Sequence, residues 1–376
     1  RMWWPNEGYK GMTWDRLVET LANPRLRRNL LNIVLRRAYV VDPLAEETEP
    51  KPLDDWYHHA DMKLFVRRET VAQVWPDASE RPEALVDVDV VPSPDISLPV
   101  TVDRVFDAAG DAALSEPKDI ALGPDGTLWI ADLGNARVVG VDEEGELVAT
   151  LGEGALRYDD GNGGTPPSAW GVGVGPDGAV YVADTWNHRV LRFEDGRQTG
   201  SFGVSGVPAN PAEELDKLFG PRDVAVGPDG EIFLTDTGNK RVIVLDGSLR
   251  AVRAIGSGGS ARGQFNEPTS LAFDPETGEL VVADLWNLRI QAFSADLLPD
   301  AEWQVDGWES TEAAHKGYLA VGPGGVVVAT DPVGSRVWFY RADGTAIGTF
   351  DLVDDDQGLR EPIGVAVDAQ GRIYVA

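Results

Sequence analysis

Residues 117–145 read PKDIALGPDGTLWIADLGNARVVGVDEEG, and this segment recurs along the chain. Close copies follow as WGVGVGPDGAVYVADTWNHRVLRFEDG from Trp170, PRDVAVGPDGEIFLTDTGNKRVIVLDG from Pro221, PTSLAFDPETGELVVADLWNLRIQAF from Pro268 and YLAVGPGGVVVATDPVGSRVWFYRADG from Tyr318. A sixth copy, EPIGVAVDAQGRIYVA, ends the sequence at Ala376. Self-similarity at a period of roughly 50 residues is typical of repeat architectures.

Each copy has the pattern of four β-strands. Ile120–Leu122 is short and apolar, as expected of a strand buried on both faces. A Gly-Pro-Asp-Gly turn follows, in which Pro restricts φ and Gly supplies a positive φ. Leu128–Ala131, Arg137–Val141 and Leu147–Leu151 complete the unit. Four antiparallel strands repeated radially describe a β-propeller blade, so the chain is predicted to be mainly β.

The third part of each copy carries a recurring polar motif. In the first unit it is Asp132-x-x-Asn135-x-Arg137, preceded by an apolar residue and Ala. These units resemble the NHL repeat, which implies a six-bladed NHL-type β-propeller over residues 101–376. The fifth unit departs from the pattern, with Ser335 in place of Asn before Arg336 and Pro332 after Asp331.

The last blade is predicted to be incomplete. The sixth unit has only its first two strands, whereas residues 101–107 before the first unit resemble an outer fourth strand. We therefore expect residues 101–107 to close the ring by joining the last blade, because closure protects sheet edges. The missing third strand leads us to expect that the natural chain continues beyond Ala376.

The first hundred residues are organised differently. Residues 1–75 are predicted to form a small α/β segment, with helices over 14–22 and 24–38 and a strand over 61–68. Residues 76–100 are acidic and rich in Pro, which favours an extended linker. Residues 101–376 form the propeller.

Several features between Trp3-Trp4-Pro5 and Arg68 carry a second resemblance. They include a helix pair rich in Leu and Arg and the strand LFVRR at residues 64–68. The segment is similar to the extracytoplasmic tail of flippase-associated, glycosyltransferase-like polytopic membrane proteins. This resemblance implies an extracytoplasmic protein anchored in the membrane through a region before Arg1, with a glycosyltransferase as the parent chain. Secretion is the alternative location.

Charge and composition exclude some functions. The net charge is −29, and residues 101–376 hold 20 basic against 45 acidic side chains. Such an acidic body repels phosphate backbones, so no nucleic-acid partner is expected. The chain has no Cys, which excludes a disulfide framework and a thiolate nucleophile.

The recurring charged residues are interpreted as structural. A catalytic site is needed once, whereas a group that fixes a turn is needed in every blade. We expect each Asp to bond its own turn and to pair with the following Arg. The residues are Asp132 and Arg137, Asp184 and Arg189, Asp236 and Arg241, Asp284 and Arg289, and Asp331 and Arg336.

Positions that vary between the units are the candidates for ligand binding. Aligning the units places Lys118, Trp170, Arg222, Thr269, Gly317 and Ile363 in a first ring at the channel mouth. A second ring holds Asp119, Gly171, Asp223, Ser270, Tyr318 and Gly364. Exposed aromatic side chains near cations suit a sugar or a peptide. The predicted ligand-binding residues are Lys118, Asp119, Trp170, Trp186, Arg222, Asp223, Trp286 and Tyr318.

The sequence offers no convergent catalytic set, and whether the protein is an enzyme stays open. Residues 101–376 contain only His188 and His315, too few for a three-His zinc site. Asp119 and Asp223 are possible oxygen ligands for a divalent cation, and otherwise no metal site or cofactor is predicted.

Three functions are therefore consistent with the sequence. The first is an extracytoplasmic recognition or scaffold propeller that binds glycan or protein at the channel-mouth face. The second is a divalent-cation-dependent lactonase or lyase. The third is a structural assembly module of an envelope complex.

Overall fold

The computed structural model describes residues 56–59, 64–67, 85–87, 105, 108–110, 112–305, 307–308, 316–351 and 361–376. The chain divides into two compact units, Arg1–Pro92 and Ser93–Ala376. The helices expected over 14–22 and 24–38 lie outside the described residues. No helix among the described residues is long and apolar enough to span a membrane.

The described residues of the first unit form a small antiparallel sheet. Its strands are β1 (Trp56–His59), β2 (Leu64–Arg67) and β3 (Leu85–Asp87), in the order β2-β1-β3. Strand β2 falls within the strand expected over 61–68. Strand β3 lies inside the segment 76–100 that we expected to be a linker, and it pairs with β1.

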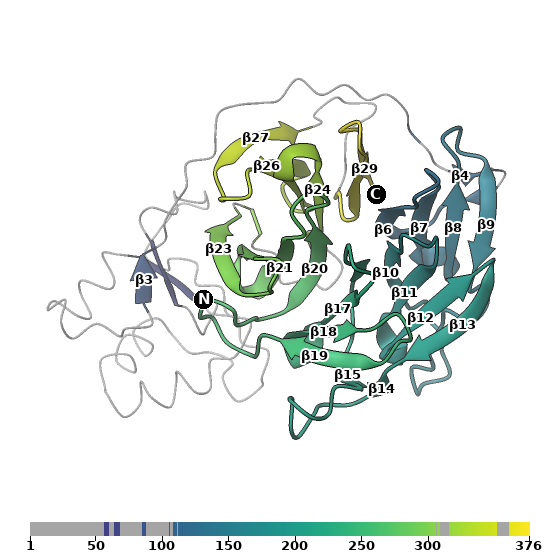
Figure 1. Ribbon diagram of the computed structural model, residues 1–376, viewed down its shortest axis with the longest axis horizontal. Coiled ribbons are helices and arrows are strands. Elements are labelled where there is room, and N and C mark those ends of the chain that lie inside the picture. Colours follow the sequence, from purple (N-terminus) through teal and green to yellow (C-terminus); the bar gives the residue numbers. More distant parts are fainter. Residues whose placement is uncertain are drawn as a thin grey trace, which may run out of the picture. The chain divides into compact units, whose positions relative to one another are not determined.

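Among the described residues of the second unit are five four-stranded antiparallel sheets, which follow one another round the ring in sequence order (Figure 1). The first sheet consists of β6 (Pro117–Leu122), β7 (Leu128–Asp132), β8 (Arg137–Val141) and β9 (Leu147–Leu151), and the second of β10 (Ala169–Val174), β11 (Val180–Asp184), β12 (Arg189–Glu194) and β13 (Arg197–Phe202). The third consists of β16 (Val224–Val226), β17 (Ile232–Asp236), β18 (Arg241–Leu245) and β19 (Ala251–Ile255), and the fourth of β20 (Pro268–Phe273), β21 (Leu280–Asp284), β22 (Arg289–Phe293) and β23 (Pro299–Gln304). The fifth consists of β24 (Leu319–Gly322), β25 (Val326–Asp331), β26 (Arg336–Tyr340) and β27 (Ala346–Asp351). We call these sheets blades 1 to 5.

Shorter paired strands accompany the blades. They are β4 (Ala108–Ala109) with β5 (Ala112–Ala113), and β14 (Val204–Ser205) with β15 (Lys217–Leu218). Within residues 101–107 the structure describes only Val105, which is not in a strand. The closing role predicted for residues 101–107 therefore lies almost entirely outside the described residues.

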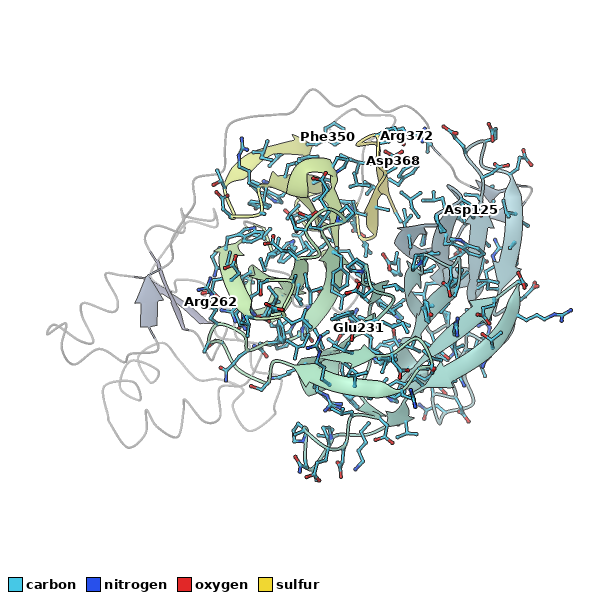
Figure 2. All side chains as sticks on the ribbon, in the orientation of Figure 1. Asp125, Glu231, Arg262, Phe350, Asp368 and Arg372 are labelled. Atoms are coloured by element: carbon cyan, nitrogen blue, oxygen red, sulfur yellow. The ribbon has the colours of Figure 1, made fainter. Side chains whose placement is uncertain are left out.

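The number of blades corrects the sequence-based prediction, because the structure has five blades and not six. The sixth unit contributes only a hairpin of β28 (Val365–Val367) and β29 (Ile373–Val375). This hairpin lies between blade 5 and blade 1, in contact with β24 and β6. Arg372 pairs with Asp368 inside the hairpin (Figure 2). It also pairs with Glu143 of blade 1.

The apolar core lies between neighbouring sheets. Val138 of blade 1 packs with Val182 and Leu191 of blade 2, and similar clusters join the later blades in turn. Ala366 and Val365 of the hairpin belong to the clusters of blade 1 and blade 5, respectively. Burying one such Val or Leu side chain contributes about 1.5–3 kcal/mol. The hairpin thus fills the space between the first and last blades, although it is not a full blade.

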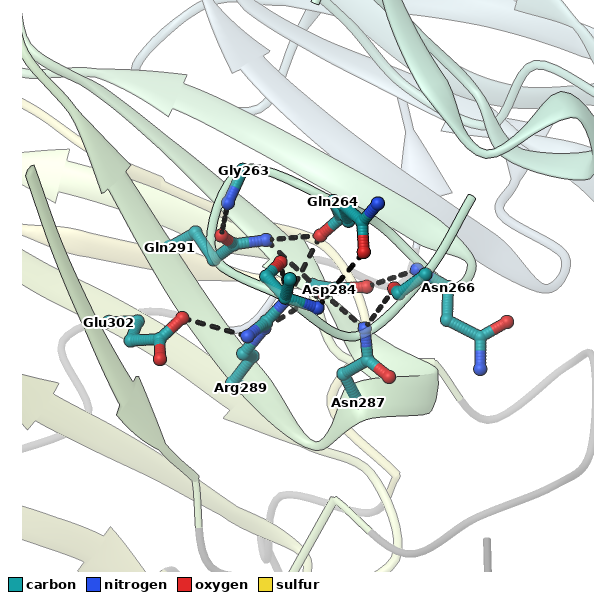
Figure 3. Close-up of polar contacts among 10 residues, drawn as sticks. Gly263, Gln264, Asn266, Asp284, Asn287, Arg289, Gln291 and Glu302 are labelled. Atoms are coloured by element: carbon teal, nitrogen blue, oxygen red, sulfur yellow. Dashed lines mark hydrogen bonds and ion pairs between the residues drawn. The ribbon is translucent and has the colours of Figure 1, made fainter. Parts of the chain in front are cut away.

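A polar network fixes the turn between the second and third strands of each blade. In blade 4, the buried carboxylate of Asp284 accepts hydrogen bonds from Asn287 Nδ2 at 2.7 Å and Arg289 Nε at 2.9 Å (Figure 3). It also accepts the backbone N–H of Asn266 at 2.6 Å. Arg289 in turn donates to the carbonyl of Gln264 at 2.9 Å. The network therefore ties the turn to the loop that enters the blade.

The same Asp–Arg pair recurs in blades 1 to 3 with N–O distances of 2.6, 2.7 and 2.8 Å. In blade 5 the pair of Asp331 and Arg336 is longer, at 3.3 Å. There Gly334, and not Ser335, takes the place of the Asn, and its N–H bonds to Asp331 at 2.9 Å. Ser335 instead adopts the left-handed conformation, with φ of 49°.

We expect Arg241→Met to destabilise the propeller by about 3–5 kcal/mol, because the substitution leaves the carboxylate of Asp236 buried without its cation. The control is Arg250→Met, which removes a solvent-exposed pair with Asp246 and should leave the unfolding free energy nearly unchanged. Urea unfolding of both variants measures the difference. Equal stabilities would contradict the role assigned to the Asp–Arg pair.

Candidate site at the channel mouth

Both rings predicted from the repeat alignment fall at the starts of the innermost strands or directly before them. The pairing of first and second strands is interrupted by irregularities at Lys118–Asp119, Trp170 and Thr269. Such bulges re-aim individual side chains without ending a strand. The variable positions of the repeat are therefore also the positions where the strands depart from regular pairing.

The second ring converges at the axis of the propeller. The carboxyl groups of Asp119 and Asp223, two blades apart, share a hydrogen bond. Gly171 lies between them, and a Cβ at that position would overlap the carbonyl oxygen of Arg222. On the other side, a Cβ at Gly364 would come within 2.5 Å of Asp119 Cα. Glycine at these two positions lets the strands approach closely enough for the carboxyl groups to meet.

The oxygens of both carboxyl groups are occupied by backbone donors. Asp119 accepts the N–H groups of Ile120 and Val172, each at 2.8 Å. Asp223 accepts those of Val224 at 2.7 Å and Leu271 at 2.9 Å. Each side chain thereby links its own strand to the innermost strand of the next blade. These carboxyl groups hold blades together.

Burial raises the pKa values of the titratable side chains in the second ring. It raises the pKa of Asp119 well above its ordinary value, and the neighbouring Asp223 raises it further. Burial also raises the pKa of Asp223 to about 6. The pKa of Tyr318 is raised by its burial and by both carboxyl groups. Tyr318 is 1% exposed, and its hydroxyl donates to the carbonyl of Arg222.

The first ring carries an aromatic and cationic group on the side of blades 1 to 3. The Arg222 guanidinium lies 4.5 Å and Lys118 Nζ 5.6 Å from ring centroids of Trp170. The Trp186 ring meets Trp170 edge-on at 6.3 Å, and Tyr158 lies 6.0 Å from Trp186. We call Lys118, Tyr158, Trp170, Trp186 and Arg222 the Trp170 cluster. Trp186 is 37% exposed, whereas Trp170 is 7% exposed.

Trp286 belongs to a separate group in blade 4. Lys316 Nζ lies 5.3 Å from its ring and pairs with Glu267 at 3.1 Å. Trp286 is 7% exposed. The expectation of several exposed aromatic side chains was therefore wrong for Trp170, Trp286 and Tyr318, all of which are buried.

The repeat alignment missed acidic residues near the first ring. Glu116, Glu267 and Glu361 each precede a Pro at the entrance to an innermost strand, and each has a left-handed φ of 48–72°. Burial lowers the pKa of Lys118, and the negative charges of Glu116 and Glu361 oppose that change. The Glu-Pro dipeptide, present in three units, is the sequence signal that could have identified these positions. Tyr158 lies in a loop outside the repeat and gave no such signal.

The described residues do not assemble a larger metal-ligand group. No cluster of three or more His, Cys, Asp or Glu side chains suited to a metal ion occurs among them. His188 Nδ1 accepts the N–H of Gly220 at 3.0 Å, and its ring stacks on Phe219. His315 lies outside the described residues.

Comparison with known proteins agrees with this architecture. Residues 167–193, 220–245 and 265–293 match the NHL repeat, and these segments lie in blades 2, 3 and 4. The chain is thus a β-propeller that carries NHL repeats. A gluconolactonase from Xanthomonas campestris shares the fold with a TM-score of 0.50 and 16% identity, over 72% of this chain and 88% of that protein.

Two curated relatives match part of the propeller. Mouse peptidyl-glycine alpha-amidating monooxygenase is 35% identical over 132 residues, which cover 34% of this chain and 14% of that protein. A probable peptidyl-alpha-hydroxyglycine alpha-amidating lyase of Caenorhabditis elegans is 30% identical over 34% of this chain and 37% of that protein. The aligned regions span well under half the length of either relative.

We expect Asp119→Asn to change how stability depends on pH. A carboxyl group whose pKa is raised on folding stabilises the fold below its unfolded value, and that stability is lost as the pH rises towards the folded value. For Asp223 the window runs from 3.8 to about 6, and the raised pKa of Asp119 extends it upward.

The wild-type Tm should therefore fall, relative to that of Asp119→Asn, as the pH rises through this window. The amide also loses one acceptor, which lowers the Tm of the variant at every pH, so the slope is the readout. Thermal unfolding across pH measures it, with the exposed Asp159→Asn as control. Parallel curves for the wild type and Asp119→Asn would show that the two carboxyl groups do not share a proton.

Proposed function

We propose that the propeller is an extracytoplasmic recognition module that binds a glycan or a peptide at the channel mouth. The observation that carries the proposal is the Trp170 cluster, where the partly exposed Trp186 stands beside Trp170 and two cations. Aromatic anchors at the centre of a polar surface supply much of the binding energy in recognition sites. The cluster lies at positions that vary between blades, as expected of a site added to a repeated frame.

The chemistry of the cluster suits ligands with an apolar face and polar edges. The exposed part of Trp186 offers a flat surface, and Lys118 and Arg222 place donors beside the neighbouring indole. Sugars and short peptides both combine these features. The extracytoplasmic location and an anchor before Arg1 are proposals from the sequence of residues 1–68, which lie mostly outside the described part of the chain.

A second candidate is an enzyme of the lyase or lactonase type. It is supported by the partial match to the amidating lyase and by the fold shared with a gluconolactonase. The buried pair of Asp119 and Asp223 is the chemical group that such a reaction would use. However, both carboxyl groups already accept backbone hydrogen bonds, which favours the architectural role. A divalent metal ion that copurifies with the chain at one equivalent would favour the enzyme.

We expect Trp186→Ala to weaken ligand binding by at least about tenfold, which corresponds to about 1.4 kcal/mol. The substitution removes an aromatic surface that is partly exposed, so the fold should persist. Glycan and peptide arrays first identify a ligand of the wild-type chain. Titration calorimetry with that ligand then compares the variants.

The matched control is Val252→Ala on the outer strand β19, where an exposed side chain is also shortened. Its affinity should equal that of the wild type. Equal affinity for Trp186→Ala would place the binding surface elsewhere. If neither array yields a ligand, the recognition function itself is wrong.

A further inference from the structure

Lys118 is a buried lysine that forms no direct ion pair among the described residues. It is 8% exposed, and among the described residues its ammonium group has neither a hydrogen-bond acceptor nor an ion-pair partner. Glu116 and Glu361 influence its charge state but lie exposed at the strand entrances. Asp119 next to it directs its oxygens at backbone N–H groups. Burial of a charge without a partner is costly, so such residues are commonly kept for a ligand.

The indole N–H of the neighbouring Trp170 also lacks a partner among the described residues. Its nitrogen, Nε1, is buried. A buried indole N–H usually finds an acceptor. Lys118 and Trp170 start adjacent innermost strands, β6 and β10, and both lie at irregularities in strand pairing. Two unsatisfied donors from neighbouring blades therefore lie at one place in the channel mouth.

The unpaired donors indicate which chemical groups a ligand needs at this place. The group offers N–H donors from Lys118 and Trp170, and a ligand must bring acceptor oxygens and negative charge. Two oxygens in one plane, as in a carboxylate, match donors from two neighbouring side chains. Residues 101–376 are strongly acidic overall, which disfavours ligands with several negative charges. A single carboxylate fits both requirements.

We propose that Lys118 Nζ and Trp170 Nε1, with Arg222 across the indole ring, bind the carboxylate of an acidic sugar whose ring lies against Trp186. The C–H face of a pyranose is apolar and suits the exposed part of Trp186, 6.3 Å from Trp170. This inference rests on the proposed recognition function and names the ligand class as a uronate.

The test compares methyl β-D-glucuronide with methyl β-D-glucoside, which lacks only the carboxylate. The wild-type chain should bind the glucuronide at least about tenfold more tightly, as measured by titration calorimetry. Lys118→Met should reduce the affinity for the glucuronide to that for the glucoside. Lys217→Met, which removes a half-exposed lysine on β15, is the control and should retain the preference.

A second measurement uses the wild-type chain, so it stands even where Lys118→Met does not fold. The indole N–H resonance of Trp170, assigned by Trp170→Phe, should shift on addition of glucuronide and stay unmoved with glucoside. Equal binding of both sugars would overturn the carboxylate subsite and leave the recognition function in place. If neither sugar binds, the assignment of a uronate as the ligand is wrong. The recognition function is then tested by whether the peptide array yields a ligand.

Discussion

The buried aspartate at the end of each second strand is the constraint on which the propeller depends. In blades 1 to 4 it accepts hydrogen bonds from an Asn and an Arg of its own turn. In these blades the Asn also donates to a carbonyl of the segment that arrives from the preceding strands. In blades 1, 3 and 4 the Arg does so as well, as Arg289 does with Gln264. One anion therefore fixes both the turn and the crossing between blades. Because this network is repeated in the blades, the residue types at the starts of the innermost strands can differ from blade to blade.

The buried side chains at the channel mouth differ in whether they have partners. In blade 4, Lys316 is satisfied by Glu267 and by the ring of Trp286. On the side of blades 1 to 3, Lys118 and Trp170 Nε1 find no acceptor among the described residues. At the axis, the carboxyl groups of Asp119 and Asp223 accept backbone hydrogen bonds that link neighbouring strands. The buried lysine of blade 4 thus has an anionic partner, whereas the buried lysine of blade 1 has none among the described residues and is suited to a ligand.

Much of the frame was predictable from local pattern. The strands expected at Arg137–Val141 and Leu147–Leu151 coincide with β8 and β9, because turn residues and apolar positions recur in register. Packing across blades was not predictable. The contact between Asp119 and Asp223 depends on how closely Gly171 lets strands of neighbouring blades approach, and the sequence of a single unit does not show that distance. The number of blades was also wrong, because the sixth unit supplies only a hairpin.

Amide hydrogen exchange can show whether the buried aspartates hold the entering loops in place. The backbone N–H groups of Ser115, Phe219 and Asn266 lie in loops and donate to Asp132, Asp236 and Asp284, respectively. Loop amides ordinarily exchange quickly, whereas amides in cooperative core structure are protected. We expect these three amides to exchange as slowly as those of the innermost strands. Exchange at the rate of exposed loop residues would show that the aspartates do not hold the blades together.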